Sequence, residues 1–221
     1  TLCWNYCLPD LWITLGITQT AGESLNWFKN GFDRNTPDVR SGDIFEQYNQ
    51  AIVNVPDGSG GVIFLPYLNG ERTPYWDSAA RGVFYGLNLS TEKAHFIKAI
   101  MEGVSFALRN NIETVESLGI QINQVRAVGG GLKSQVWLET LGKILRKPVI
   151  TVSVADTANL GNMILCSRAL GMTVSLEAVV NKMVTTDKKI DFHESTPIYE
   201  KNYGIFLDLY DQLREIYRRS S

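Results

Sequence analysis

The stretch VRAVGGGLKS, residues 125–134, decides the fold because it joins a short apolar segment to a helix through three consecutive glycines. Residues 124–128 have the length and β-branched character of a buried strand, and residues 134–145 carry apolar side chains at helical spacing. Glycines after a strand let a ligand approach the backbone, and the helix that follows presents free N–H groups to negative charge. The pattern favours a phosphate-binding turn, and a tight turn without a ligand is the alternative.

Two known phosphate motifs can be compared with this turn. The P-loop GxxxxGK[ST] does not fit, because Leu132 rather than glycine precedes Lys133. The dinucleotide fingerprint GxGxxG fits better: Gly129 and Gly131 match, Ser134 replaces the third glycine, and Asp156 follows the next strand where a ribose-binding acid would lie. A Rossmann-like domain of an NAD-dependent dehydrogenase therefore stays open as an alternative.

Outward from this turn, strands and helices alternate. The predicted helices lie at residues 22–28, 43–52, 91–119, 159–170 and 199–217, and the predicted strands at 62–66, 83–85 and 149–154. We expect Thr91 to cap the long helix, and the aromatic stripe of the last helix to dock on the core. This order predicts one α/β domain with a parallel or mixed sheet flanked by helices.

A charged, glycine-rich segment, residues 65–87, precedes the long helix. Charges within such a loop need partners, because an unpaired buried charge is costly. We expect Glu71 or Asp77 to pair with Arg72 or Arg81, which gives the segment an architectural rather than a catalytic role.

Composition excludes several classes of function. The net charge of -2 argues against nucleic-acid binding, and no apolar run is long enough to cross a bilayer, so we expect neither nucleic-acid nor membrane partners. The three cysteines form no CxxC pair, which is typical of reduced thiols in a cytoplasmic protein. We expect Cys3 and Cys7 to be buried on one helical face.

Three motifs in order give a resemblance to a known family. The sequences LPYLNGERTPYWDSAARGVFYGL (65–87), KAIMEGVSFALRNNIE (98–113) and AVGGGLKSQVWLETLGKILRKPV (127–149) resemble the C-terminal half of the FGGY family of carbohydrate kinases. The opening TAGESLNW (20–27) is similar to the family's AGxxLxW helix. The likeness covers almost the whole chain.

The resemblance implies an actin-like ATPase domain of the ribonuclease-H-like class, as in the hexokinase and actin superfamily. Residues 1–221 would then be the C-terminal nucleotide-binding domain of an ATP- and Mg²⁺-dependent sugar or polyol kinase. The N-terminal sugar-binding and catalytic domain, with the catalytic base, would lie outside this chain. We therefore expect the chain alone to be inactive. A non-catalytic binding or assembly module derived from a kinase is a further alternative, and a homodimer is compatible with the sequence.

The resemblance also assigns residues to the nucleotide. Gly130 and Gly131 match glycines that lie against it, Ser134 and Gln135 occupy polar positions at the next helix start, and Gly22 and Asn26 match positions on the adenine side. No residue of this chain matches a catalytic or metal-binding position. The family's small residues in the helix after the next strand are replaced by Asn162 and Met163, which would narrow the space beside the nucleotide.

Overall fold

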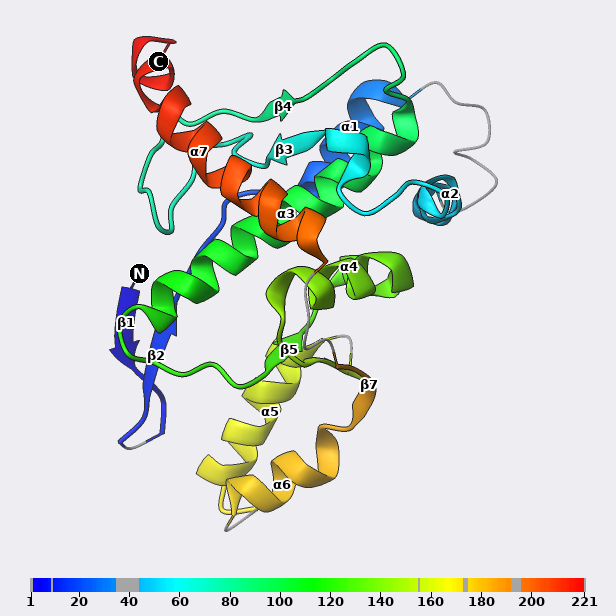
Figure 1. Cartoon of the computed structure of the whole chain (residues 1–221). Coiled ribbons are helices and arrows are strands. Elements are labelled where there is room, and N and C mark those ends of the chain that lie inside the picture. Colours follow the sequence, from blue (N-terminus) through cyan, green and yellow to red (C-terminus); the bar gives the residue numbers. More distant parts are fainter. Residues whose placement is uncertain are drawn as a thin grey trace.

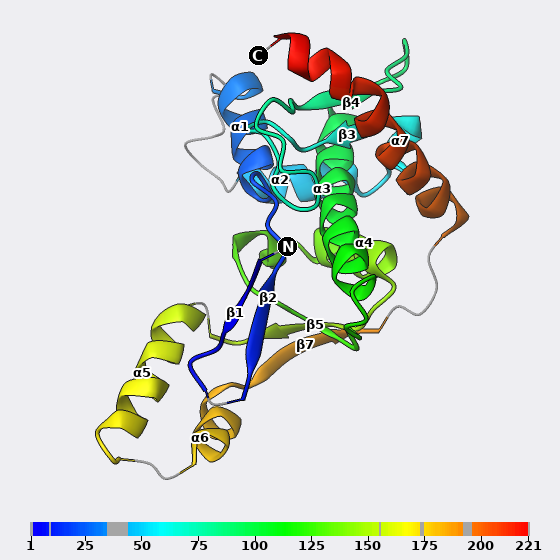
Figure 2. The same ribbon diagram turned by 90° about the vertical axis from the view of Figure 1, so that its left-hand side faces the viewer.

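A computed structural model describes residues 2–8, 10–34, 44–154, 156–172, 175–191 and 196–220. Its long central helix α3 (Lys93–Glu116) lies among α1 (Glu23–Phe32), α2 (Ile44–Ile52), the strands β3 (Ile63–Leu65) and β4 (Val83–Tyr85), and α7 (Pro197–Ser220) (Figure 1). A small sheet with α4 (Gln135–Leu145) follows at the other end of α3, and α5 (Thr157–Ala169) and α6 (Leu176–Met183) lie beyond it (Figure 2).

Helix α3 forms because its apolar residues recur every three or four positions and meet neighbours on several sides. It begins one residue later than a Thr91 cap would place it, since Glu92 and not Thr91 is its cap: the Glu92 side chain accepts the backbone N–H of His95, whose Nδ1 accepts the Glu92 N–H at 3.1 Å. The Thr91 hydroxyl instead accepts the Asn88 N–H at 3.0 Å. This reciprocal cap fixes where the central helix starts.

The glycine-rich segment between β3 and β4 is architectural, but its partners differ from those predicted. Glu71 is buried and accepts the Thr18 hydroxyl at 2.5 Å and the backbone N–H groups of Gln19 and Arg72. Asp77 accepts the Tyr210 hydroxyl at 2.9 Å. Within the described residues neither carboxylate pairs with an arginine of the segment, because backbone amides and hydroxyls already fill these acceptor positions.

The sheet at the far end of α3 is mixed, as predicted. Strands β5 (Val125–Ala127) and β6 (Val149–Val152) run parallel, with Val125 opposite Val149, and β7 (Thr186–Ile190) pairs antiparallel with β6. Helix α4 packs against this sheet through Leu138, Leu141 and Leu145. Strand β7 was not predicted, because it is polar and exposed and therefore lacks an alternating apolar pattern. Helix α6 was not predicted either.

The chain opens with an antiparallel hairpin, β1 (Leu2–Asn5) and β2 (Trp12–Leu15), which the sequence did not predict. The expectation of a helical face bearing buried Cys3 and Cys7 is wrong: Cys3 lies in β1 and both thiols are exposed. Trp4 and Trp12 are also exposed, so the hairpin does not bury its largest apolar side chains. It therefore contributes little to the core.

Helix α7 docks on the core through an aromatic stripe, as predicted. Tyr199, Tyr203, Phe206, Tyr210 and Tyr217 are buried and pack with residues of β3 and α3. Burial of an aromatic stripe of this size contributes a large share of the apolar area removed from water. Helix α7 is thus held against α3 and β3 by this part of the core.

Candidate functional site

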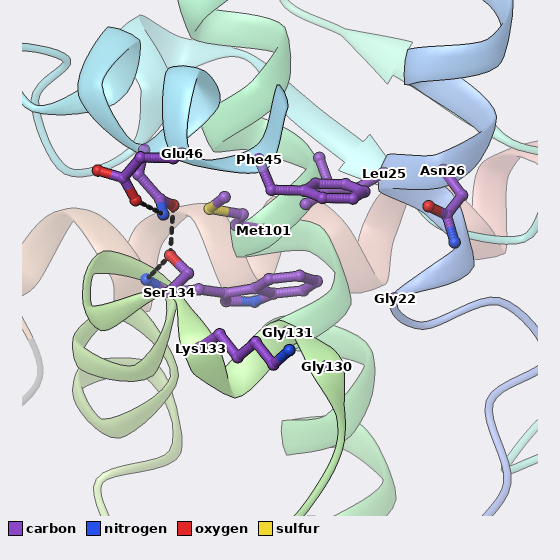
Figure 3. Close-up of a pocket in the computed structure, with 12 residues that line it drawn as sticks. Gly22, Leu25, Asn26, Phe45, Glu46, Met101, Gly130, Gly131, Lys133 and Ser134 are labelled. Atoms are coloured by element: carbon purple, nitrogen blue, oxygen red, sulfur yellow. Dashed lines mark hydrogen bonds between the residues drawn. The ribbon is translucent and has the colours of Figure 1, made fainter. Parts of the chain in front are cut away.

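A cavity of about 390 Å³ lies between four elements, a size that suits a small-molecule ligand. Helices α1 and α2, the middle of α3, and the turn that contains the short 3₁₀ helix η3 (Gly130–Lys133) and leads into α4 form its walls (Figure 3). Its lining residues are Gly22, Leu25, Asn26, Phe45, Glu46, Asn49, Met101, Gly130, Gly131, Lys133, Ser134 and Trp137. Segments more than 100 residues apart in the sequence therefore meet here.

Glycines shape two sides of this cavity. A Cβ built at Gly22 or Gly130 would meet no atom within 4 Å, so both backbones border open space. A Cβ at Gly131 would lie 2.9 Å from the ring of Trp137, so the turn rests directly on that indole. Gly129 has a φ of 121°, which side-chain-bearing residues rarely adopt. Within the turn, Gly129 thus allows the sharp bend, Gly130 leaves an open face, and Gly131 allows the close approach to Trp137.

Ser134 both begins α4 and lines the cavity. Its hydroxyl oxygen accepts the Trp137 N–H at 3.1 Å, which caps the helix, and its own hydrogen is donated to Asn49 Oδ1 at 2.6 Å (Figure 3). Asn49 Nδ2 in turn donates to Glu46 Oε2 at 3.3 Å. A continuous chain of hydrogen bonds therefore joins α4 to α2 along one wall.

Five of the six predicted nucleotide-binding residues line this one cavity: Gly22, Asn26, Gly130, Gly131 and Ser134. Gln135 does not, because its side chain turns along the surface, where it donates to Glu139 at 2.9 Å and accepts from Lys188 at 3.0 Å. What these residues bind stays a prediction.

Two other expected positions lie elsewhere. Asn162 and Met163, predicted to narrow the space beside a ligand, are exposed on α5 and are absent from the cavity lining. Asp156, the ribose-binding acid of the dehydrogenase alternative, caps α5 by accepting the Asn159 N–H at 3.1 Å and its Nδ2 at 2.7 Å. Neither feature takes part in the cavity.

Seven lining residues were not predicted: Leu25, Phe45, Glu46, Asn49, Met101, Lys133 and Trp137. Lys133 and Trp137 follow the glycine turn closely in the sequence, and this closeness is a signal from which they could have been predicted. Phe45, Glu46 and Asn49 could not, because nothing in the sequence indicates that α2 faces the turn after β5. The approach of α2 to this turn depends on how α2 and α4 each pack on α3.

Behind the cavity wall lies a buried carboxylate. Glu102 follows the lining residue Met101 on α3 and accepts the Gly58 N–H at 2.9 Å, the Ser59 hydroxyl at 2.8 Å and the Tyr199 hydroxyl at 3.1 Å. Burial raises the pKa of Glu102 to about 7, although these donors act in the opposite direction. The group therefore titrates near neutral pH, on the side of α3 that faces α7.

No group of three or more histidine, cysteine or acidic side chains with metal-binding geometry occurs in the described part of the chain. Among the described residues that line the cavity, Glu46 is the one carboxylate, and its two oxygens accept the amides of Asn49 and Gln50 at 3.3 and 3.4 Å. Among the described helices, none combines the length and apolar character required to span a membrane.

Comparisons with known proteins give a consistent result. A model of the "FGGY family of carbohydrate kinases, C-terminal domain" matches residues 3–170. The xylulose kinase of Staphylococcus epidermidis is 30% identical over 213 residues, covering 96% of this chain and 42% of the relative. The gluconokinase of Bacillus subtilis is 30% identical over 209 residues, covering 92% and 41%.

A solved structure shows the same likeness. The ligand-bound xylulose kinase from Lactobacillus acidophilus superimposes with a TM-score of 0.76 at 28% identity, over 90% of this chain and 39% of that one. The chain thus spans about 40% of the length of the relatives it matches.

Proposed function

The chain belongs to the FGGY family of carbohydrate kinases, and on that premise we propose that it is the nucleotide-binding part of an enzyme that transfers the γ-phosphate of ATP to an alcohol group of a sugar or polyol. The observation that carries this proposal is the glycine-lined cavity. Gly22, just before α1, and Gly130 on η3 border its open space, and neither has a side chain to occupy it.

The walls of the cavity suit a nucleotide. Phe45, Met101 and Trp137 offer apolar surface for a flat base, and such rings bury well against aromatic side chains. The turn at Gly130 and Gly131 would lie against the phosphates, close to the start of α4, where backbone N–H groups and the helix dipole favour negative charge. Lys133, exposed beside the same turn, would add a positive charge.

Phosphoryl transfer requires little covalent chemistry from the protein, so catalysis depends on positioning and on neutralising charge. In this proposal the chain holds ATP before and ADP after the transfer. The base that accepts the proton of the attacking hydroxyl, and most contacts with the sugar, belong to the remaining 60% or so of the polypeptide, by comparison with the relatives' length. We assign no catalytic residue to this chain.

The described residues do not fit a protein-bound metal site, because they contain no group of three metal-binding side chains and only one of them that lines the cavity is a carboxylate. Mg²⁺ commonly binds through substrate phosphates with few protein ligands. We therefore place the Mg²⁺ of the proposed reaction with ATP itself and assign this chain no step that depends on it.

The dehydrogenase alternative has weaker support. Its ribose-binding acid, Asp156, caps α5 and does not line the cavity. The homodimer and the cytoplasmic location stay predictions.

A single substitution tests the proposed site. Gly130→Leu would place an apolar side chain at the border of the cavity, and its Cβ would meet no atom within 4 Å. We expect the full 221-residue chain to bind ADP in calorimetric titrations, and the variant to lose at least tenfold in affinity. Gly161→Leu is the matched control, because Gly161 also has no neighbour within 4 Å but lies on α5, outside the lining.

Three results would contradict the proposal. Equal ADP affinity in both variants would place the nucleotide elsewhere. Binding of NAD without any response to ADP would support the dehydrogenase, and binding of neither would support the non-catalytic module. Sugar-dependent ADP formation by the purified chain would refute our expectation that it is inactive alone.

A further inference from the structure

A row of three side-chain oxygens joins the loop before β3, the first turn of α7 and α3. The hydroxyl oxygen of Tyr199 is 2.9 Å from Asp57 Oδ1 and 3.1 Å from Glu102 Oε1, and both distances are those of hydrogen bonds. Burial and the two neighbouring carboxyl groups raise the pKa of Tyr199, so the hydroxyl keeps its hydrogen. That single hydrogen can serve only one of the two contacts. The other contact requires a hydrogen from a carboxyl group.

The two carboxyl groups have different surroundings. Asp57 is partly exposed and accepts Lys143 Nζ at 2.9 Å and Lys98 Nζ at 3.3 Å. Burial acts to raise the pKa of Asp57, but the hydrogen bonds from Lys143 and Tyr199 outweigh it and lower that pKa, so Asp57 is ionised. Glu102 is 1% exposed, and Lys98, one turn earlier on α3, directs its ammonium group to Asp57 instead. Glu102 is therefore the group that supplies the second hydrogen.

The same carboxyl group holds a strained loop against α7. Glu102 accepts the Gly58 N–H and the Ser59 hydroxyl, and these two residues have φ values of 86° and 51°. A serine rarely adopts such a φ unless its surroundings hold it there. A Cβ at Gly58 would lie 2.5 Å from Ile198 Cγ1, and Asn202 Nδ2 donates to the Gly58 carbonyl at 3.3 Å. The loop, α3 and the first turn of α7 thus meet at Glu102.

Loss of the Glu102 hydrogen would disturb this junction. Tyr199 could then donate to one carboxylate only, and its oxygen would face the other without a hydrogen between them. Two negative charges would also lie on either side of the Tyr199 hydroxyl and repel each other. Both effects weaken the contact between the first turn of α7 and α3, along which α7 crosses the molecule (Figure 1).

We propose that Glu102 donates a hydrogen to Tyr199, and that loss of this hydrogen on raising the pH loosens the first turn of α7 from α3. Glu102, Tyr199 and Asp57 together form this latch. Since the pKa of Glu102 is about 7, the latch is closed below that pH and loosens above it. None of its three residues lines the cavity, so the inference does not depend on the proposed function.

Other charged groups around the latch are accounted for. Lys98 on α3 and Lys143 on α4 both pair with Asp57. The His95 ring on α3 lies against Gly60 of the loop, because a Cβ there would lie 2.9 Å from its Cδ2. A test must therefore follow Glu102 itself.

The first experiment follows the side-chain carboxyl carbon of Glu102 by carbon-13 NMR of the full 221-residue chain, assigned through its couplings to the backbone. We expect it to titrate near pH 7 instead of its ordinary value of 4.5. Asp57→Asn should lower this midpoint by about one pH unit, because a neighbouring negative charge is removed. Asp208→Asn, at an exposed position of α7, is the matched control and should leave the midpoint unchanged.

The second experiment measures hydrogen exchange in α7 at pH 6 and pH 8, corrected for the intrinsic rate at each pH. Protection of the first turn should fall about fivefold at pH 8, as expected for one lost hydrogen bond, relative to the last turns of the same helix. Glu102→Gln should bring this ratio close to one, because its amide can donate to Tyr199 at either pH. Glu71→Gln is the matched control: Glu71 is also buried with a raised pKa but bonds to Thr18, and the fivefold change should remain.

Two results would overturn the inference. A Glu102 carboxyl that titrates near 4.5 would show that it holds no hydrogen at neutral pH. A titration near 7 with equal protection of the first turn at pH 6 and pH 8 would show that the hydrogen does not control α7. The titration and Asp57→Asn decide the first point even if Glu102→Gln fails to fold.

Discussion

The central helix α3 and the outlying helices α5 and α6 differ sharply in how they are stabilised. Of the 24 residues of α3, 14 are buried, whereas α5 buries Ile164 alone and α6 buries none of its residues. The apolar residues of α3 meet helices and a strand on several sides. Those of α5 show almost no common face, so no single packing surface could cover them.

The chain therefore combines a well-packed core around α3 with a region, α5 and α6, in which few apolar side chains are buried. Leu170 and Met172, after α5, are 75% and 76% exposed. Regions with few buried apolar contacts open locally at low free-energy cost. The cavity lies on the well-packed side, between α1, α2, α3 and the start of α4, so its geometry depends on the core and not on the outlying helices.

The largest expected effect breaks the core at the contact between α3 and β3. A Cβ at Gly103 would lie 2.2 Å from the Phe64 carbonyl oxygen, so Gly103→Ala forces the helix and strand apart. We expect a loss of about 3 kcal/mol in the free energy of unfolding, measured by urea titration.

Gly204→Ala in α7 is its matched control, because a Cβ there meets nothing within 4 Å. Alanine in an exposed helix interior should add about 0.5–1 kcal/mol. Equal effects of the two substitutions would show that α3 does not need its close approach to β3.

A smaller effect is expected from pH. Because the folded-state pKa of Glu102, about 7, lies above its ordinary value of 4.5, the folded chain binds this proton more tightly than the unfolded chain. The contribution to stability is complete below pH 4.5 and decreases as pH rises to 7, by about 1–3 kcal/mol. Urea titrations at pH 5 and pH 8 measure the difference.

Glu102→Gln isolates this group. The variant should be less stable overall, because glutamine offers one acceptor oxygen to three donors, but its stability should depend less on pH. Burial also raises the pKa of Glu71 and adds a change of the same sign. An unaltered slope in Glu102→Gln would assign the pH dependence to Glu71 or another group.

The smallest expected effect comes from removing a serine helix cap, either in the core or in the outlying part with α5 and α6. Ser134 caps α4 and Ser175 caps α6, each by accepting a backbone N–H, at 3.1 and 3.2 Å respectively. Ser134→Ala should cost about 1–2 kcal/mol of global stability because α4 is part of the core. Ser175→Ala should change global stability by less than about 0.5 kcal/mol, while hydrogen exchange within α6 becomes faster. Equal losses of global stability would show that α6 unfolds together with the core.

Periodicity predicted the helices well where apolar positions were regular. Helix α3 and the aromatic stripe of α7 were found within a few residues, since buried faces impose spacing on a sequence. The β1–β2 hairpin and β7 were missed for the opposite reason: their exposed residues are under no such constraint. Helix α6 was missed although Leu176, Val179 and Val180 recur at helical spacing. The cap of α3 was placed one residue early because a glutamate cap paired with a histidine is an uncommon form of the capping box.

The sequence by itself determined the family and the glycine turn, because backbone conformation and missing side chains are local properties that residue types specify. It also predicted five residues that line one cavity. Only the tertiary structure decided that α2 forms the opposite wall, that Ser134 donates to Asn49, and that Gln135 turns away. These contacts join residues up to 85 positions apart, and their geometry comes from how separate helices pack on α3, which no local pattern encodes.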